Sequence, residues 1–122
     1  MATVRVLAIG AAAEGVMGIA CIAVPSVVVR LLLGADVSPA AAAITRVAGF
    51  GLLALAIACW PTAEVLHLRI ALRALLAYNA LAALFFLYLE FGGELAGRVL
   101  WVAAAFHVIM TILLVRVWVR RT

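Results

Sequence analysis

The chain has 122 residues, of which 70% are apolar and 11% are charged, against roughly half and roughly a quarter in soluble domains. A soluble protein of this length could not bury that much apolar surface, so we expect one domain whose partner is the lipid bilayer. The net charge of +4 comes from arginine without any lysine. Because these arginines are spread along the chain, mostly at segment ends, without a basic patch or a binding motif, we expect no nucleic-acid partner.

Four apolar stretches follow one another along the chain, each close to the roughly twenty residues that a membrane-spanning helix needs. They cover residues 4–24, 40–60, 70–89 and 99–118. The first is longer than the apolar core of a secretory signal peptide, so we expect it to stay in the membrane as a helix. Strands would leave backbone groups unpaired in lipid. The predicted fold class is therefore all-α, an integral membrane antiparallel four-helix bundle.

The breaks between these stretches contain proline or paired glycine. Pro25 ends the first stretch, and the apolar residues 27–33 that follow are expected to lie along the membrane interface. Ser38 followed by Pro39 predicts an N-cap at the start of the second helix. The other two breaks fall at Pro61 and at Gly92-Gly93.

The arginines that flank these helices predict the orientation of the chain. If it crosses the membrane four times, one side carries Arg5, Arg69, Arg73, Arg116, Arg120 and Arg121, and the other carries only Arg30 and Arg98. The positive-inside rule then places both termini in the cytoplasm. Aromatic residues at the helix ends agree, with Trp60 and Trp118 at the inner interface and Tyr88 and Trp101 at the outer one.

Small residues recur at close-packing spacing on the first two predicted helices. Ala11, Gly15 and Gly18 lie on the first, and Thr45 and Gly49 on the second. Such positions allow helix backbones to approach closely. We expect a tight contact inside the bundle; a homodimer face is the alternative.

Four strongly polar side chains fall within the predicted spans, where they are costly and usually face a bundle interior or a cavity. Glu14, Asn79 and His107 lie near the middle of the first, third and fourth helices, and Arg46 lies about four residues from the middle of the second. Each has small residues three or four positions away, on the same helix face. We therefore expect the four groups to meet near mid-membrane, with Tyr78 close to them.

Pairings within this group follow from the cost of an isolated buried charge. Arg46 and Glu14 are expected to form an ion pair. His107 is expected to remain neutral and to find hydrogen-bond partners in Asn79 and in Thr111, one turn below it. These six residues (Glu14, Arg46, Tyr78, Asn79, His107 and Thr111) either fix the helix register or form a binding pocket, and the sequence leaves both interpretations open.

No catalytic residue, cofactor or metal site is predicted. The sequence has no nucleophile triad, phosphate-binding glycine loop or metal-spaced cysteine set, and a single intramembrane histidine is a poor metal or haem site. The leading hypothesis is a non-enzymatic, ligand-binding or accessory subunit of a membrane complex. The alternatives are a proton-coupled small-molecule transporter that uses Glu14 and a membrane enzyme that acts on a lipid or quinone.

Two family resemblances follow from these residues. The pattern Glu14-Gly15-x-x-Gly18, Arg46-x-x-Gly49 and a polar residue in each later helix resembles the DoxX-like small four-helix bacterial membrane proteins. That resemblance implies an antiparallel bundle in the bacterial inner membrane. The length, the helix count and the mid-helix glutamate are also similar to small multidrug resistance transporters, which implies proton and cation exchange at Glu14. The aromatic and glycine pattern of that family's third helix is missing from residues 77–81.

Overall fold

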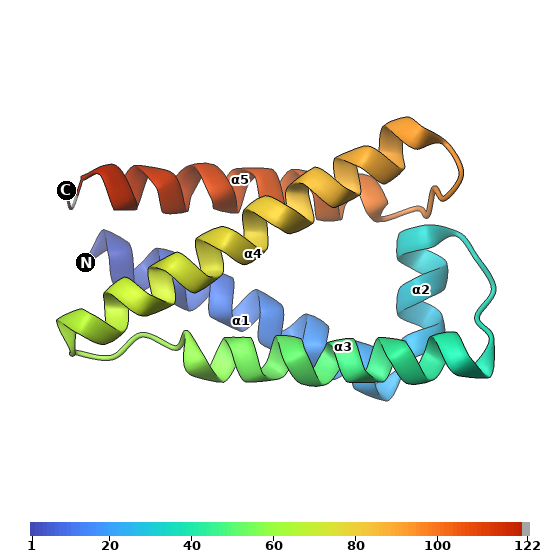
Figure 1. Ribbon diagram of the computed structural model, residues 1–122, viewed down its shortest axis with the longest axis horizontal. Helices are drawn as coiled ribbons and strands as arrows, with labels where there is room; N and C mark the ends of the chain where they lie inside the picture. Colours follow the sequence, from blue (N-terminus) through green and yellow to red (C-terminus); the bar gives the residue numbers. More distant parts are fainter. Residues whose placement is uncertain (121–122) are drawn as a thin grey trace.

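The computed structural model describes residues 1–120, whose regular elements are all helices. They are α1 (Ala2–Ala23), α2 (Pro25–Leu33), α3 (Pro39–Ala58), α4 (Val65–Gly92) and α5 (Leu100–Val119). All except α2 are long and apolar enough to cross a membrane. These four alternate in direction along the bundle (Figure 1). The predicted all-α membrane bundle is confirmed, and the chain is a multi-pass membrane protein.

The two ends of the bundle differ. Both termini and the α3–α4 connection lie at one end, which we call the terminal end (Figure 1). The short helix α2 and the loop between α4 and α5 lie at the other, which we call the α2 end. The start of α1 and the end of α5 therefore share one end of the bundle, as four membrane crossings require.

The long helices pack as two close pairs, α1 with α3 and α4 with α5. In the first pair the backbones touch at Gly18 and Gly49. A Cβ atom on Gly18 would lie 2.8 Å from the carbonyl oxygen of Gly49, and one on Gly49 would lie 2.7 Å from that of Gly18. The predicted tight contact of small residues inside the bundle is thus present between α1 and α3.

The hydrophobic core that joins the two pairs lies in the half of the bundle nearest the terminal end. It combines the first half of α1, the first half of α4 and the second half of α5, with Cys59 after the end of α3. Its members are Leu7, Ala11, Cys59, Leu68, Ala71, Leu72, Leu75, Met110, Leu114 and Val117. The other half of the bundle is packed differently: there α4 and α3 diverge and α2 stands across the long axis between them (Figure 1).

The short helix α2 is held at both ends. Pro25 occupies its first turn, and Gly34 ends it in the left-handed conformation with φ of 70°. The last carbonyl groups of a helix lack partners within it. Here the amide of Gly97 donates to Leu32 O at 3.1 Å and the amide of Val99 donates to Leu31 O at 3.0 Å. The loop before α5 therefore fastens α2 across the α2 end.

The observed helix bounds agree with the sequence prediction at the start of α3 and differ from it in α4. Ser38 caps α3 through a hydrogen bond from Ala41 N to its Oγ at 3.1 Å, with Pro39 in the first turn, as predicted. By contrast, α4 has 28 residues where residues 70–89 were expected. At 1.5 Å per residue it is about 42 Å long, more than the roughly 30 Å of hydrocarbon. It crosses the bundle obliquely (Figure 1), which accommodates the additional length.

Candidate polar pocket between the helices

Three of the polar residues meet inside the bundle. Glu14 on α1, Asn79 on α4 and His107 on α5 are 2%, 0% and 7% exposed. Glu14 belongs to the buried face of α1 that also contains Gly10, Ala11, Gly18 and Cys21. This is the face that the sequence predicted, and the expected meeting of these three side chains is confirmed.

A chain of hydrogen bonds fixes the His107 ring. The Asn79 side-chain amide donates from Nδ2 to the Leu75 carbonyl oxygen at 2.9 Å, which leaves Oδ1 of Asn79 facing the imidazole. His107 Nδ1 lies 2.9 Å from this Oδ1. Because an amide oxygen only accepts, Nδ1 must carry the proton in this pair. The predicted bond between Asn79 and His107 is confirmed.

Glu14 is the third member of the polar group, and one of its carboxyl oxygens lacks a hydrogen-bond partner among the described residues. Its Oε1 lies 4.0 Å from His107 Nδ1, too far for a hydrogen bond. This oxygen is enclosed and has no hydrogen-bond partner among the described residues. The Tyr78 hydroxyl lies next to the Glu14 carboxyl group and interacts with it. A buried oxygen without a partner is costly, and such costs are concentrated at functional sites.

Aromatic rings surround the imidazole. The ring centroids of Tyr78, Phe86 and Phe106 lie 5.8, 5.3 and 5.4 Å from that of His107, and the Tyr78 and Phe106 rings meet it edge to face. These separations are typical of favourable aromatic contacts. The three rings and the Asn79 hydrogen bond together hold the imidazole in one orientation.

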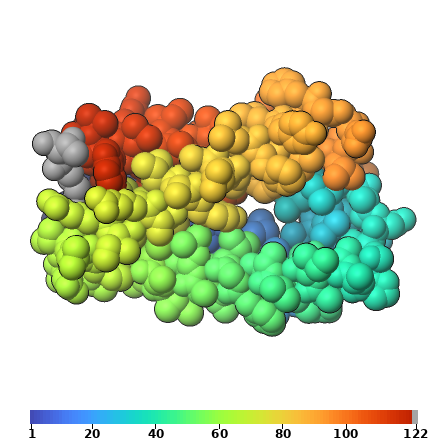
Figure 2. Space-filling model, viewed as in Figure 1, coloured from blue at the N-terminus to red at the C-terminus, as the bar shows by residue number. Residues whose placement is uncertain are grey.

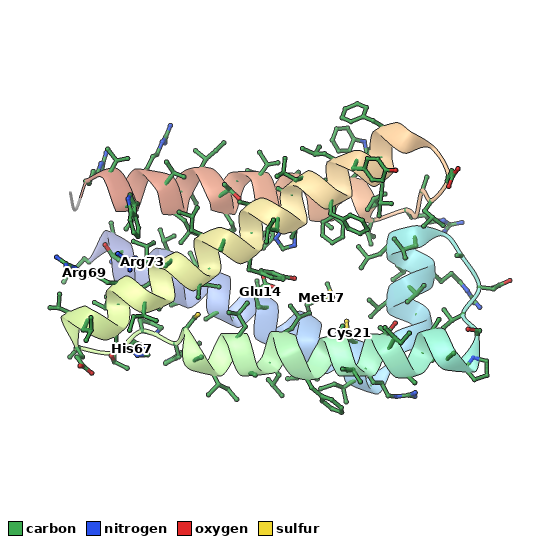
Figure 3. The ribbon with its side chains drawn as sticks, in the orientation of Figure 1. Glu14, Met17, Cys21, His67, Arg69 and Arg73 are labelled. Carbon is green, nitrogen blue, oxygen red and sulfur yellow. The ribbon has the colours of Figure 1, made fainter. Side chains whose placement is uncertain are left out.

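This group forms one wall of a cavity of about 590 Å³ that lies between the two helix pairs. Every helix of the bundle contributes to its lining, and polar character is confined to Glu14, Tyr78 and His107. The apolar lining includes Met17, Leu32, Leu52, Phe86, Val102, Ala103 and Phe106. Figure 2 shows the surface hollowed between α4, α3 and α2, with α1 visible at the bottom of the hollow. Glu14, Met17 and Cys21, which all line the cavity, follow one another along α1 (Figure 3).

Arg46 does not join this group, and the predicted ion pair with Glu14 is wrong. Its Nε donates to the Ile22 carbonyl oxygen at 3.3 Å, and the side chain is exposed on the outside of the bundle. The reason is that α1 ends at Ala23, so the Ile22 carbonyl has no partner within its helix. A cation at a helix C-terminus also interacts favourably with the helix dipole. Arg46 therefore caps α1 and leaves Glu14 without a positively charged neighbour.

Thr111 also lies outside the cavity lining. Its hydroxyl donates to the backbone carbonyl of His107 at 2.7 Å rather than to the imidazole. This bond to the preceding turn is a common way for a helical threonine to satisfy its hydroxyl. Of the six residues singled out from the sequence, three line the cavity, and Asn79 supports them from behind the imidazole.

Several lining residues were not singled out from the sequence. Phe86 lies two turns after Asn79 on α4, and Met17 lies three residues after Glu14 on α1, so both share a face with a polar residue. Helical spacing from the polar positions would have found them. Leu32 comes from α2. The apolar residues 27–33 predicted a segment along the interface, but no local pattern showed that it would line a cavity.

The described residues contain no group of three or more histidine, cysteine or acidic side chains placed to hold a metal ion. Both cysteines, Cys21 and Cys59, are free and buried. The polar pocket is thus built from a carboxyl group, a phenol and an imidazole in an otherwise apolar cavity. Comparison of the chain with protein-family models, curated proteins and solved structures finds no match.

Proposed function

We propose that this protein binds a lipid-soluble small molecule in the cavity between its two helix pairs, without catalysing a reaction. The observation that carries the proposal is the cavity itself, with apolar walls and a carboxyl, a phenol and an imidazole gathered at one side. Its volume of about 590 Å³ falls within the range of ligand sites. Such sites combine apolar walls with a few polar groups that orient the ligand.

The ligand reaches this cavity from the side, through the bilayer. The opening lies between α3 and α4 where these helices diverge (Figure 2), and both helices are apolar enough to span the membrane. A molecule dissolved in the lipid can enter there without crossing an aqueous phase. With both termini in the cytoplasm of a bacterial cell, the opening lies in the outer half of the inner membrane. That orientation, like a relationship to DoxX-like proteins, is part of the proposal and rests on the arginines and motifs described above.

The test fills the cavity with a side chain from the protein itself. Ala103 on α5 lines the cavity, whereas Ala105, two positions further along the same helix, faces outward. Wild type, Ala103→Phe and the matched control Ala105→Phe are purified from native membranes in mild detergent. Organic extracts of each are then compared by mass spectrometry, and thermal melting checks that all three proteins are folded.

We expect a compound that co-purifies with wild type and with Ala105→Phe and is depleted in Ala103→Phe. Adding that compound back should raise the melting temperature of the first two proteins, because a ligand that binds only the folded state stabilises it. Identical extracts from all three folded proteins would contradict a ligand site in this cavity.

Proton-coupled transport of a small molecule is the second candidate function, and the position of Arg46 favours it. An arginine paired with Glu14 would neutralise the carboxylate that a transported cation or proton needs. Arg46 instead binds the end of α1, and the Glu14 carboxyl group has no cationic partner. In proteoliposomes, an imposed pH gradient should then drive uptake of tetraphenylphosphonium by wild type and not by Glu14→Gln. Uptake that does not depend on the pH gradient would rule out proton-coupled transport.

A further inference from the structure

His107 lines the cavity, and only one of its two ring nitrogens has a hydrogen-bond partner. The Asn79 amide donates to Leu75 O, so its oxygen must accept from His107 Nδ1. The Nδ1 proton of His107 is therefore used in the bond to Asn79. The ring is then left with a lone pair on Nε2. No described residue bonds to Nε2. Nε2 is also not among the fully enclosed atoms without a partner, a state found only for Glu14 Oε1 in the described residues. Because His107 lines the cavity, a molecule there can reach Nε2.

The contacts around the ring include no short charge-assisted bond to the neighbouring carboxylate. An imidazolium beside a carboxylate forms a short charge-assisted bond of about 2.7–2.9 Å. Here Nδ1 lies 2.9 Å from the neutral amide oxygen of Asn79 and 4.0 Å from Glu14 Oε1. We therefore take the imidazole to be neutral, with Nε2 as a hydrogen-bond acceptor.

We infer that the cavity takes a lipid-soluble alcohol or phenol, whose hydroxyl group donates a hydrogen bond to His107 Nε2. This inference rests on the proposed function and names its ligand class. Ethers and ketones have only acceptor oxygens, so they would leave Nε2 unpaired. A quaternary cation has no hydrogen to donate. The apolar part of the alcohol or phenol packs against Phe86 and Phe106, which flank the imidazole and line the cavity.

Asn79 is the positioning residue in this arrangement. It does not line the cavity, but it determines which nitrogen of His107 carries the proton. Replacing it with leucine removes the acceptor for Nδ1 and allows either nitrogen to be protonated. Selectivity for a hydroxyl group should then fall although every residue that contacts the ligand is unchanged.

Nitrogen-15 NMR of the protein in lipid nanodiscs shows directly which nitrogen of each histidine carries the proton. The chain has only two histidines, and they are expected to be opposite tautomers. His67 Nε2 lies 2.9 Å from the Trp60 carbonyl oxygen, so this nitrogen must donate. His107 should instead carry its proton on Nδ1. With histidine labelled, His67→Gln assigns the two sets of signals, and in the unmodified chain His67 is an internal reference far from the cavity.

The probes are 4-octylphenol and its methyl ether 4-octylanisole, in which a methyl group replaces the hydroxyl hydrogen. We expect the phenol to shift the His107 Nε2 signal and to bind about two- to tenfold more tightly than the ether, the range of one net hydrogen bond. The His67 signals should not move with either probe. In Asn79→Leu the preference for the phenol should shrink, and His107 should show mixed tautomers.

The outcomes separate the inference from the proposed function. If both probes bind wild type equally and the Nε2 signal does not shift, the cavity still binds a ligand, but the inference that the ligand is an alcohol or phenol is wrong. A His107 ring protonated on Nε2, or on both nitrogens, would also overturn the inference. A third outcome would overturn both the inference and the proposed function. In it, neither probe binds wild type, and neither probe changes the melting temperature of wild type or of Ala103→Phe.

Discussion

Adding one methyl group to Gly49 tests the contact that holds α1 against α3. A Cβ atom there would lie 2.7 Å from the Gly18 carbonyl oxygen and 2.9 Å from both the Cys21 Cβ and the Ile22 Cγ1. The first two neighbours cannot move by changing a rotamer, so the helices must separate. Overpacking of this kind costs about 1–3 kcal/mol, and we expect Gly49→Ala to lower the free energy of unfolding by that amount.

Gly51 provides the matched control on the same helix. It is two residues from Gly49, faces outward and has no atom within 4 Å of an added Cβ. Alanine there gains only helix propensity, up to about 1 kcal/mol. Gly51→Ala should therefore leave stability unchanged or slightly raised, whereas Gly18→Ala, which meets backbone atoms of Gly49 and Leu53 at 2.8 Å, should resemble Gly49→Ala.

The assay is unfolding in mixed detergent micelles followed by circular dichroism, with all variants at the same protein and detergent concentrations. Equal stability of Gly49→Ala and Gly51→Ala would show that the α1 and α3 backbones do not touch at this point. The packing of the first helix pair, and with it the position of the cavity wall, would then be wrong.

Three other predictions concern the Glu14–Arg46 pair, the orientation in the membrane and the metal content. Glu14→Gln and Arg46→Gln should be additive in a double-mutant cycle, within about 0.5 kcal/mol, because the two side chains do not pair; a coupling above 1 kcal/mol would restore the ion pair expected from the sequence. A reporter active only in the periplasm should be silent when fused to the C-terminus, and strong activity would reverse the orientation. Purified protein should contain no stoichiometric zinc, copper or iron and no Soret band; a Soret band that disappears in His107→Ala would make this a cofactor protein.

The sequence was most informative where polar and small residues mark a helix face. On α1, Glu14 stands among small residues, and the face on which it lies is the buried one. Asn79 and His107 were placed at matching depth by counting residues from the helix ends, and they form a hydrogen bond. Such residues are few in a chain that is otherwise apolar on every side, so each carries much information about packing.

The sequence was least informative where lipid and protein faces are equally apolar. Most of α3 is exposed, with only Gly49 and Ala56 buried, and its hydrophobic pattern does not distinguish the two faces. Arg46 was misplaced because its partner is a backbone carbonyl at the end of α1. Pro25 predicts the end of α1, but no local pattern shows that Arg46 on α3 lies beside that end rather than beside Glu14.

The most direct test of a ligand site between the helix pairs is an experimental map of the protein in nanodiscs formed from its native membrane, at a resolution that separates side chains from bound molecules. We expect non-protein density in the cavity between the two helix pairs, with one end within hydrogen-bond distance of His107 Nε2. A cavity closed by inward movement of Phe86 and Phe106, or filled only by disordered lipid tails that make no contact with His107, would contradict it.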